Sequence, residues 1–241
     1  MDPMQMLLLL LIGAGAGFIQ RVSGFGLGIF AMLFLPHFLP THTAAATIAC
    51  FLSCGTSTYN AVKHRKNIPF KTILPLLGAA FIMIPLAVRF AAWLPAAVFK
   101  IILGVVLIGL SVYFLFFDHR VHMKPTVANG LLAGGIGGTL NGLFSTGGPP
   151  IVLYLTHATA DKTAYFAGIQ FYFALTNIYA AVFRFLNGAV TVDLLVHTAI
   201  GFLGCMAGDT AGRFVFDKLD AKKLKRIIYI GMIISGLLMI V

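Results

Sequence analysis

Charged residues are scarce in this chain of 241 residues, and acidic residues are fewer than half as common as basic ones. Only 10% of the residues are charged and 59% are hydrophobic, whereas about one quarter of an ordinary soluble domain is charged. The composition therefore excludes a soluble globular domain. Because a spanning helix needs about 20 apolar residues, a chain this apolar predicts an all-α, polytopic transmembrane protein.

The few charged residues are unevenly distributed. Seven acidic residues against 17 Lys plus Arg give a formal net charge of +10, which in a soluble chain would suggest a nucleic-acid partner. Here the basic residues gather in connectors between apolar segments, as at 63–66 and 222–226. Such connectors are typical of the cytoplasmic side of membrane proteins. We therefore expect a lipid bilayer around the chain and no nucleic acid.

Several signatures of enzymes and cofactor sites are missing. The three cysteines, Cys50, Cys54 and Cys205, have no CxxC or metal-ligand spacing, so neither disulfides nor a zinc site is indicated. The chain has no GxxxxGK[ST] phosphate loop and no convincing set of Ser, His and acid for an intramembrane hydrolase. We expect no enzyme activity, no metal and no cofactor.

Apolar segments fill nearly the whole chain, separated by Gly, Pro or charged residues. The segments at 25–39 and 148–158 each follow a Gly-rich stretch, and the second is too short to cross a bilayer alone. We expect these two to be broken or re-entrant helices. The ten predicted segments are 5–20, 25–39, 43–62, 72–90, 97–117, 126–143, 148–158, 163–186, 190–212 and 226–241.

The basic residues also predict the topology. If all ten segments cross and the 63–71 loop is cytoplasmic, only Arg89, Lys100 and Arg184 of the 17 basic residues fall outside. The positive-inside rule then places both termini outside the cytoplasm. Four arginines lie near segment ends, where we expect the side chains to reach the lipid headgroups: Arg21, Arg89, Arg184 and Arg213.

The chain repeats itself. Residues 22–26 align with 144–148, and the Tyr-x-Ala-Val pattern at 59–62 aligns with 179–182. The alignment divides the chain into two repeats, 1–120 and 121–241, each with five segments. An odd number of segments forces the second repeat to be inverted in the membrane. Inverted repeats are the architecture of secondary transporters.

The strongest local signals are two Gly-rich stretches at corresponding positions of the repeats, which we call the first break (Ser23–Gly28) and the second break (Ser145–Pro150). Glycine lets a helix unwind, and a helix that restarts presents unpaired N–H groups with a partial positive charge. Such an end binds anions, and Pro149 and Pro150 suit its first turn. The candidate anion-binding residues of the breaks are Ser23, Gly24, Gly26, Ser145, Thr146, Gly147 and Gly148.

Other glycines have a different spacing. Gly13/Gly17, Gly134/Gly138 and Gly204/Gly208/Gly212 follow the small-xxx-small pattern, in which successive members are four positions apart. We expect these glycines to let helices pack closely rather than to bind a ligand.

Polar residues inside apolar segments are expensive in a bilayer and are therefore further candidates. Gln20 and Arg21 precede the first break, Asn141 precedes the second, and Gln170 and Asn177 lie on the eighth segment. We add these five to the candidate site, although an interhelical hydrogen bond explains Asn141 and Asn177 equally well.

Asp209 is the only acidic residue well inside an apolar segment, four residues before Arg213. Residues at this spacing meet on one face of a helix. We interpret Asp209 as a structural ion-pair partner, with coupling to proton transport as the alternative.

Four histidines suggest an alternative from another class. His37, His42, His157 and His197 raise the hypothesis of a membrane-embedded redox or haem-binding enzyme, because paired histidines on helices ligate haem. Three of them fall at segment ends beside Pro or Thr, which favours interfacial capping instead. A third alternative is an anion channel whose filter is built from the same helix ends.

The two breaks and their surroundings resemble the sulfite exporter TauE/SafE family, also called TSUP. A Gly-rich first helix ends in Ser23-Gly24-Phe25-Gly26, and a second, at 130–142, leads to Ser145-Thr146-Gly147-Gly148-Pro149-Pro150. The resemblance covers essentially the full length. It implies a bacterial inner-membrane permease for a small anion such as sulfite, sulfoacetate or a related organosulfonate, often in the export direction.

Physical considerations agree with export. An inside-negative potential drives each negative charge outward with about 2.3 kcal/mol per 100 mV. Uptake of the same anion would need a co-transported cation, and Asp209 would then be the first candidate for its site. The sequence leaves open which anion is carried and whether the protein forms a homodimer.

Overall fold

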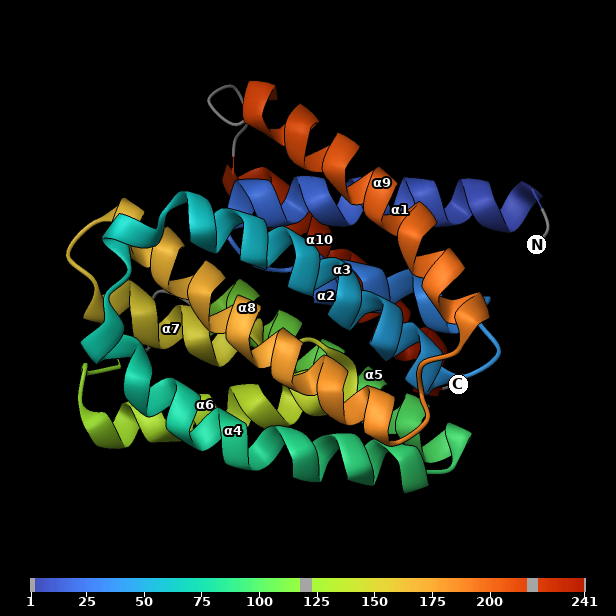
Figure 1. Cartoon of the computed structure of the whole chain (residues 1–241), viewed down its shortest axis with the longest axis horizontal. Helices are drawn as coiled ribbons and strands as arrows, with labels where there is room; N and C mark the ends of the chain where they lie inside the picture. The colour runs from blue at the N-terminus through green and yellow to red at the C-terminus, as the bar shows by residue number, and fades with distance from the viewer. Residues whose placement is uncertain (1–2, 118–122, 216–220, 241) are drawn as a thin grey trace.

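The computed structural model describes residues 3–117, 123–215 and 221–240, and within these ranges it is helical with no strand. Ten α-helices follow one another along the chain (Figure 1). They are α1 Pro3–Ser23, α2 Leu27–Phe34, α3 His42–Lys63, α4 Phe70–Trp93, α5 Ala96–Val112, α6 Val127–Phe144, α7 Gly148–Ala158, α8 Lys162–Leu186, α9 Val192–Val215 and α10 Ala221–Ile240. The prediction of ten helical segments is confirmed.

Within the part of the chain that the structure describes, five helices are long and apolar enough to cross a bilayer. These spans are Pro3–Ser23, Phe70–Trp93, Ala96–Phe116, Lys162–Leu186 and Val192–Phe214. Large apolar side chains on their outer faces are strongly exposed, including Leu74 at 70%, Trp93 at 74% and Phe214 at 76%. A surface of this kind suits lipid, and the chain is a multi-pass membrane protein.

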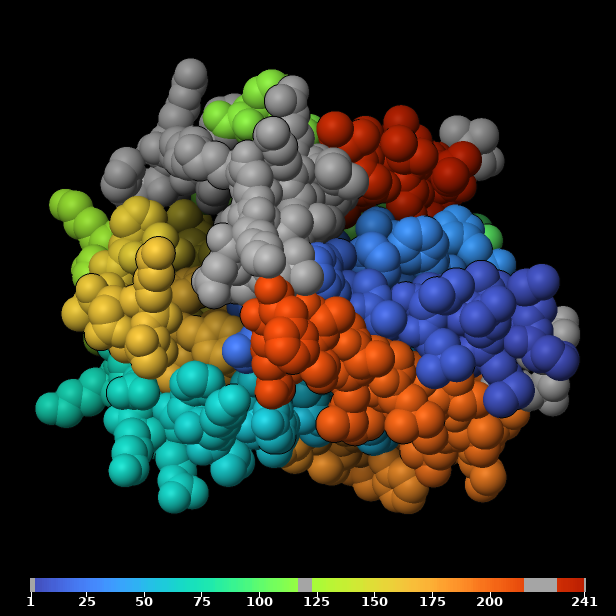
Figure 2. Space-filling view, turned by 90° about the horizontal axis from the view of Figure 1, so that it is seen from above, coloured from blue at the N-terminus to red at the C-terminus, as the bar shows by residue number. Residues whose placement is uncertain are grey.

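The helices pair across the sequence. α1 packs along α9 and α4 packs along α6, while α3 packs against α8 and α5 against α10 (Figure 1). Figure 2 shows the blue α1 beside the orange α9 on one face of the molecule. If α1–α5 are exchanged in order with α6–α10, the pair α1–α9 becomes α6–α4, and the pairs α3–α8 and α5–α10 stay the same. The helix pairs are therefore symmetric between the two halves of the chain, as an inverted repeat requires. The boundary between 1–120 and 121–241 stays a prediction.

The small-residue pattern operates at the two closest pairs. A Cβ added to Gly13 or Gly17 would overlap the backbone of Gly201 or Cys205 on α9. On the other pair, a Cβ at Gly134 would overlap the backbone of Leu76, while one at Gly138 would lie 2.7 Å from the Cα of Ala80. These glycines therefore serve close helix packing, as predicted.

Candidate functional site

The first break separates α1 from the short helix α2. α1 ends at Ser23, and Gly24 and Gly26 have φ angles of 79° and 100°, in the left-handed region. Glycine enters this region at little cost, so the chain turns here and α2 begins at Leu27. The eight residues of α2 are too few to cross a bilayer, as expected for a broken helix.

The second break has the same plan with different residues. α6 ends at Phe144, and Ser145 adopts a left-handed φ of 58°, unlike any other non-glycine residue that the structure describes. Gly147 caps the eleven-residue helix α7, whose first turn contains Pro149 and Pro150. The predicted restart of a helix after each break is confirmed.

The two breaks touch each other. The Cα of Gly28, in the first turn of α2, lies directly against the backbone carbonyl of Ser145. At the start of α7, a Cβ on Gly148 would come within 3.0 Å of the Phe25 ring. The N-terminal ends of α2 and α7 therefore meet, and because Pro149 and Pro150 have no N–H, the backbone donors of the first three residues of α7 reduce to that of Gly148.

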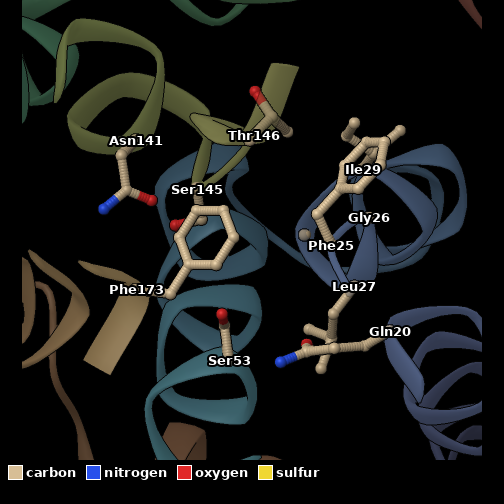
Figure 3. Close-up of a pocket in the computed structure, with 12 residues that line it drawn as sticks. Gln20, Phe25, Gly26, Leu27, Ile29, Ser53, Asn141, Ser145, Thr146 and Phe173 are labelled. Carbon is tan, nitrogen blue, oxygen red and sulfur yellow. The ribbon is translucent and has the colours of Figure 1, made fainter. Parts of the chain in front are cut away.

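A small cavity of about 10 Å³ lies at this meeting point, enough for about one water molecule (Figure 3). Its walls come from both breaks and from α1, α3, α6 and α8. The lining residues are Gln20, Phe25, Gly26, Leu27, Gly28, Ile29, Ser53, Asn141, Ser145, Thr146, Gly148 and Phe173. Six predicted site residues are among them: Gln20, Gly26, Asn141, Ser145, Thr146 and Gly148.

Two donors at the cavity have no hydrogen-bond acceptor. They are the amide nitrogen Nδ2 of Asn141 and the hydroxyl Oγ1 of Thr146, in residues only 1% and 2% exposed. A buried polar atom without a partner costs about 1–3 kcal/mol, so such atoms call for an explanation. Both belong to the second repeat, and both could donate to an oxyanion.

The polar groups of the first break are satisfied by one another. Gln20 Nε2 donates to Ser57 Oγ at 3.0 Å and to Gln170 Oε1 at 3.2 Å. Gln170 Nε2 in turn donates to the backbone carbonyl of Gly24 at 2.8 Å. The predicted residues Gly24 and Gln170 thus support the first break without lining the cavity.

Asn177 also lies one layer behind the cavity. Its Nδ2 donates to the hydroxyl of Ser53, a lining residue, at 2.9 Å, and its backbone carbonyl accepts from Cys50 Sγ at 3.4 Å. The interhelical hydrogen bond between α8 and α3 that we considered for Asn177 is therefore present.

Arg184 is the residue that the sequence reading placed wrongly. Its side chain does not reach the headgroups: it is 1% exposed and buried among α3, α6 and α8. Nη2 donates to the Gly142 carbonyl at 2.8 Å and reaches the Ser145 hydroxyl at 3.4 Å. Nη1 reaches Thr47 Oγ1 at 3.5 Å, and Nε has no acceptor. The last turn of α6 draws the guanidinium inward, because its unpaired carbonyls attract a positive charge.

Three predicted residues lie beside the cavity without lining it. The guanidinium carbon of Arg21 lies 5.9 Å from the centre of the Phe166 ring. The Ser23 hydroxyl donates to the Ile19 carbonyl at 2.7 Å and also to the Phe25 carbonyl, which fixes the turn of the first break. A Cβ on Gly147 would overlap the Gly137 carbonyl, so this glycine brings α7 against α6.

The predicted ion pair on α9 is present and lies away from the cavity. Arg213 Nη2 and Nε donate to Asp209 Oδ2 at 2.6 and 3.0 Å, and the guanidinium also lies 5.8 Å from the Tyr59 ring centre. Neither residue lines the cavity.

The histidines that raised the haem hypothesis have local contacts. His42 stacks on Phe99 with ring centres 5.4 Å apart, while His157 and His197 each bond a backbone carbonyl one helical turn back. Within the described ranges, no three His, Cys, Asp or Glu side chains gather into a group that could hold a metal ion.

Comparison with known proteins identifies a family for this chain. Neither a curated protein nor a solved structure matches the chain significantly. The family model described as "Sulfite exporter TauE/SafE" matches residues 9–239, which is nearly the whole chain and includes both breaks. This protein therefore belongs to the sulfite exporter TauE/SafE family of membrane transporters.

Proposed function

We propose that this protein is a secondary transporter that carries a small oxyanion across the bacterial inner membrane and binds it where the two breaks meet. The observation that carries the proposal is the pair of buried, acceptorless donors, Asn141 Nδ2 and Thr146 Oγ1, in two residues that line a cavity between two helix N-termini. An anion of several oxygens satisfies both donors and the unpaired N–H groups together. A neutral or cationic solute would leave the partial positive charge of these donors uncompensated.

The substrates that fit this description are sulfite, sulfoacetate or a related organosulfonate. Each ends in a group of sulfur-bound oxygens that accept hydrogen bonds and can face hydroxyl, amide and backbone donors at once. The family supplies the sulfur chemistry, and the donors supply the physical reason for an oxyanion. Export needs no coupling ion, because the membrane potential drives the anion outward.

Alternating access fits the cavity better than an open channel. A space of about 10 Å³ holds about one water molecule, so a sulfonate group enters only after the breaks move apart. The apolar side chains of Phe25, Leu27 and Phe173 form much of the wall and would have to shift on one side at a time. We propose that relative movement of the two repeats opens the site alternately to each side.

Efflux of ³⁵S-sulfite from proteoliposomes tests this function. The variant Thr146→Val removes the acceptorless hydroxyl with little change in shape. The matched control is Thr156→Val, which alters an exposed threonine on α7, the helix that follows the second break. We expect saturable efflux from the parent and the control, and about tenfold slower efflux from Thr146→Val, the loss expected for one charge-assisted hydrogen bond. Absence of sulfite efflux from the parent, or equal rates in all three proteins, would overturn the proposal.

A further inference from the structure

The burial of Arg184 requires a reason that the proposed function does not by itself provide. A charged side chain deep in a membrane protein costs several kcal/mol unless a partner compensates it. The usual partner is a carboxylate, yet the chain contains no glutamate and only seven acidic residues in all. Two of the three acidic residues that the structure describes are paired elsewhere, Asp193 with His197 and Asp209 with Arg213. The remaining described acid, Asp161, caps the N-terminus of α8, at the opposite end of that helix from Arg184.

The groups that do surround Arg184 are neutral. α6 offers the carbonyls of Asn141 and Gly142, and α3 offers the Thr47 hydroxyl. The carbonyl end of a helix corresponds to about half a negative charge. The guanidinium is therefore only partly compensated, and its Nε has no acceptor.

The partly compensated charge of the Arg184 guanidinium lies next to the proposed binding site. Nη2 of Arg184 is 3.4 Å from the hydroxyl of Ser145, and Ser145 lines the cavity. The same nitrogen is 3.5 Å from the backbone carbonyl of Asn141, which is also a lining residue. Arg184 itself is not on the cavity wall, so it acts across one layer of residues. An arginine stays protonated at every physiological pH, which makes it a permanent charge.

We infer that Arg184 is the fixed positive charge that makes the site selective for anions, acting through Ser145 and the end of α6. It is a positioning and selectivity residue, because it touches the break and not the substrate. The inference rests on the proposed function. At an effective dielectric constant of about 20, a charge one residue layer away favours an anion over a neutral molecule of the same shape by about tenfold or more.

Two ligands of the same shape separate charge from packing. Methanesulfonate carries one negative charge, and methanesulfonamide is its neutral counterpart. Affinities of both would be measured by competition with ³⁵S-sulfite for the detergent-purified parent, Arg184→Lys and Arg184→Gln. We expect the parent and Arg184→Lys to prefer methanesulfonate by about tenfold or more, and Arg184→Gln to bind both ligands within about twofold of each other. Arg89→Gln is the control, because Arg89 lies over Trp93 near the exposed end of α4.

The outcomes are distinguishable. If Arg184→Gln loses both ligands by the same factor and keeps the parent's preference, Arg184 is only a cap for α6 and the inference is wrong. If the parent binds neither sulfite nor methanesulfonate, the proposed function itself fails. If Arg184→Gln does not fold, Arg184→Lys still decides, because a pure cap depends on the guanidinium fork and its loss would weaken both ligands equally.

Discussion

Gly28, at the start of α2, lies directly against the backbone carbonyl of Ser145, so the first break rests on the second. The contact joins residues 117 positions apart, one from each predicted repeat (145 minus 28). A movement of one break must therefore displace the other or separate from it. Alternating access at this point would consist of making and breaking such contacts.

The first prediction concerns position 28, where the contact with Ser145 leaves no room for a side chain. In Gly28→Ala the new methyl group would overlap the Ser145 carbonyl, and overpacking of this kind costs about 1–3 kcal/mol. We expect sulfite efflux to be lost and the melting temperature in detergent to fall by several degrees. Gly135→Ala is the control, because no atom lies within 4 Å of the added Cβ at that position of α6. Normal efflux from Gly28→Ala would mean that the breaks are not in close contact in the working protein.

A second prediction concerns the ion pair on α9. If Asp209 serves structure, Asp209→Asn and Arg213→Gln should each lower stability modestly, and the double variant should be no worse than the worse single one. An ion pair at this helical spacing has a coupling free energy of about 0.3–0.5 kcal/mol at a fully exposed site, and the burial of Asp209, which is 8% exposed, should make it larger. Thermal unfolding of the four proteins measures the coupling, and sulfite efflux should be unchanged. Efflux abolished by Asp209→Asn with unchanged stability would instead indicate that this carboxyl group carries a coupled proton.

A third prediction concerns His64, in the connector that follows α3. Its pKa lies below the usual 6.5 because of partial burial, with added repulsion from Lys63 and Arg21. Both His64 and the Arg21 guanidinium contact the Phe166 ring. Arg21→Gln removes one positive charge and should raise the pKa of His64 toward 6.5, whereas Arg65→Gln should leave it unchanged. The resonance of the imidazole Cε1 proton, followed by NMR against pH, gives the value directly.

The lowered pKa of His64 also determines whether the stability of the protein rises or falls with pH. The unfolded chain binds a proton on His64 more readily than the folded one, so stability rises with pH in this range. The contribution of His64 is present above pH 6.5 and is lost as the pH falls through the lowered pKa. A His64 pKa above 6.5 in the parent, or stability that grows on acidification and depends on His64, would contradict this reading.

Much of the fold could be predicted from the sequence because its signals are local. Apolar segments punctuated by Gly, Pro and charge identify all ten helices, and the shortness of α2 and α7 follows from the position of the two breaks. The four-residue spacing of Gly13 and Gly17 correctly predicted close packing. These patterns depend on a single helix or turn and need no knowledge of its neighbours.

The site could be predicted only in part because its partners come from distant segments. The breaks themselves were found, but nothing in the sequence indicates that Ser53 and Phe173 complete the cavity wall, or that Gln20 is satisfied by Ser57 and Gln170. Whether a polar side chain faces the cavity or the layer behind it depends on the rotation of each helix, which weak amphipathicity leaves undetermined.

The environment of Arg184 was predicted wrongly because it depends on a helix that is distant in the sequence. Near a segment end, an arginine usually extends to the headgroups, and the sequence cannot reveal that the end of α6 lies close enough to draw it inward. One signal was available. Residues 183–186 of the second repeat correspond to the basic residues 63–66 of the first repeat, and three of these four positions are apolar in the second repeat. Arg184 is nevertheless basic, on the side of the membrane where the positive-inside rule disfavours basic residues.

Direct binding of ³⁵S-sulfite to the purified protein tests the central claim, that an oxyanion binds between the two breaks. The comparison includes Asn141→Ala and Ser145→Ala, with Thr156→Val as control. We predict saturable binding by the parent and the control, and binding at least about tenfold weaker in the two variants, because each loses a donor or a contact at the meeting of the breaks. Parent-like binding by both variants would contradict the account and place the anion elsewhere in the protein.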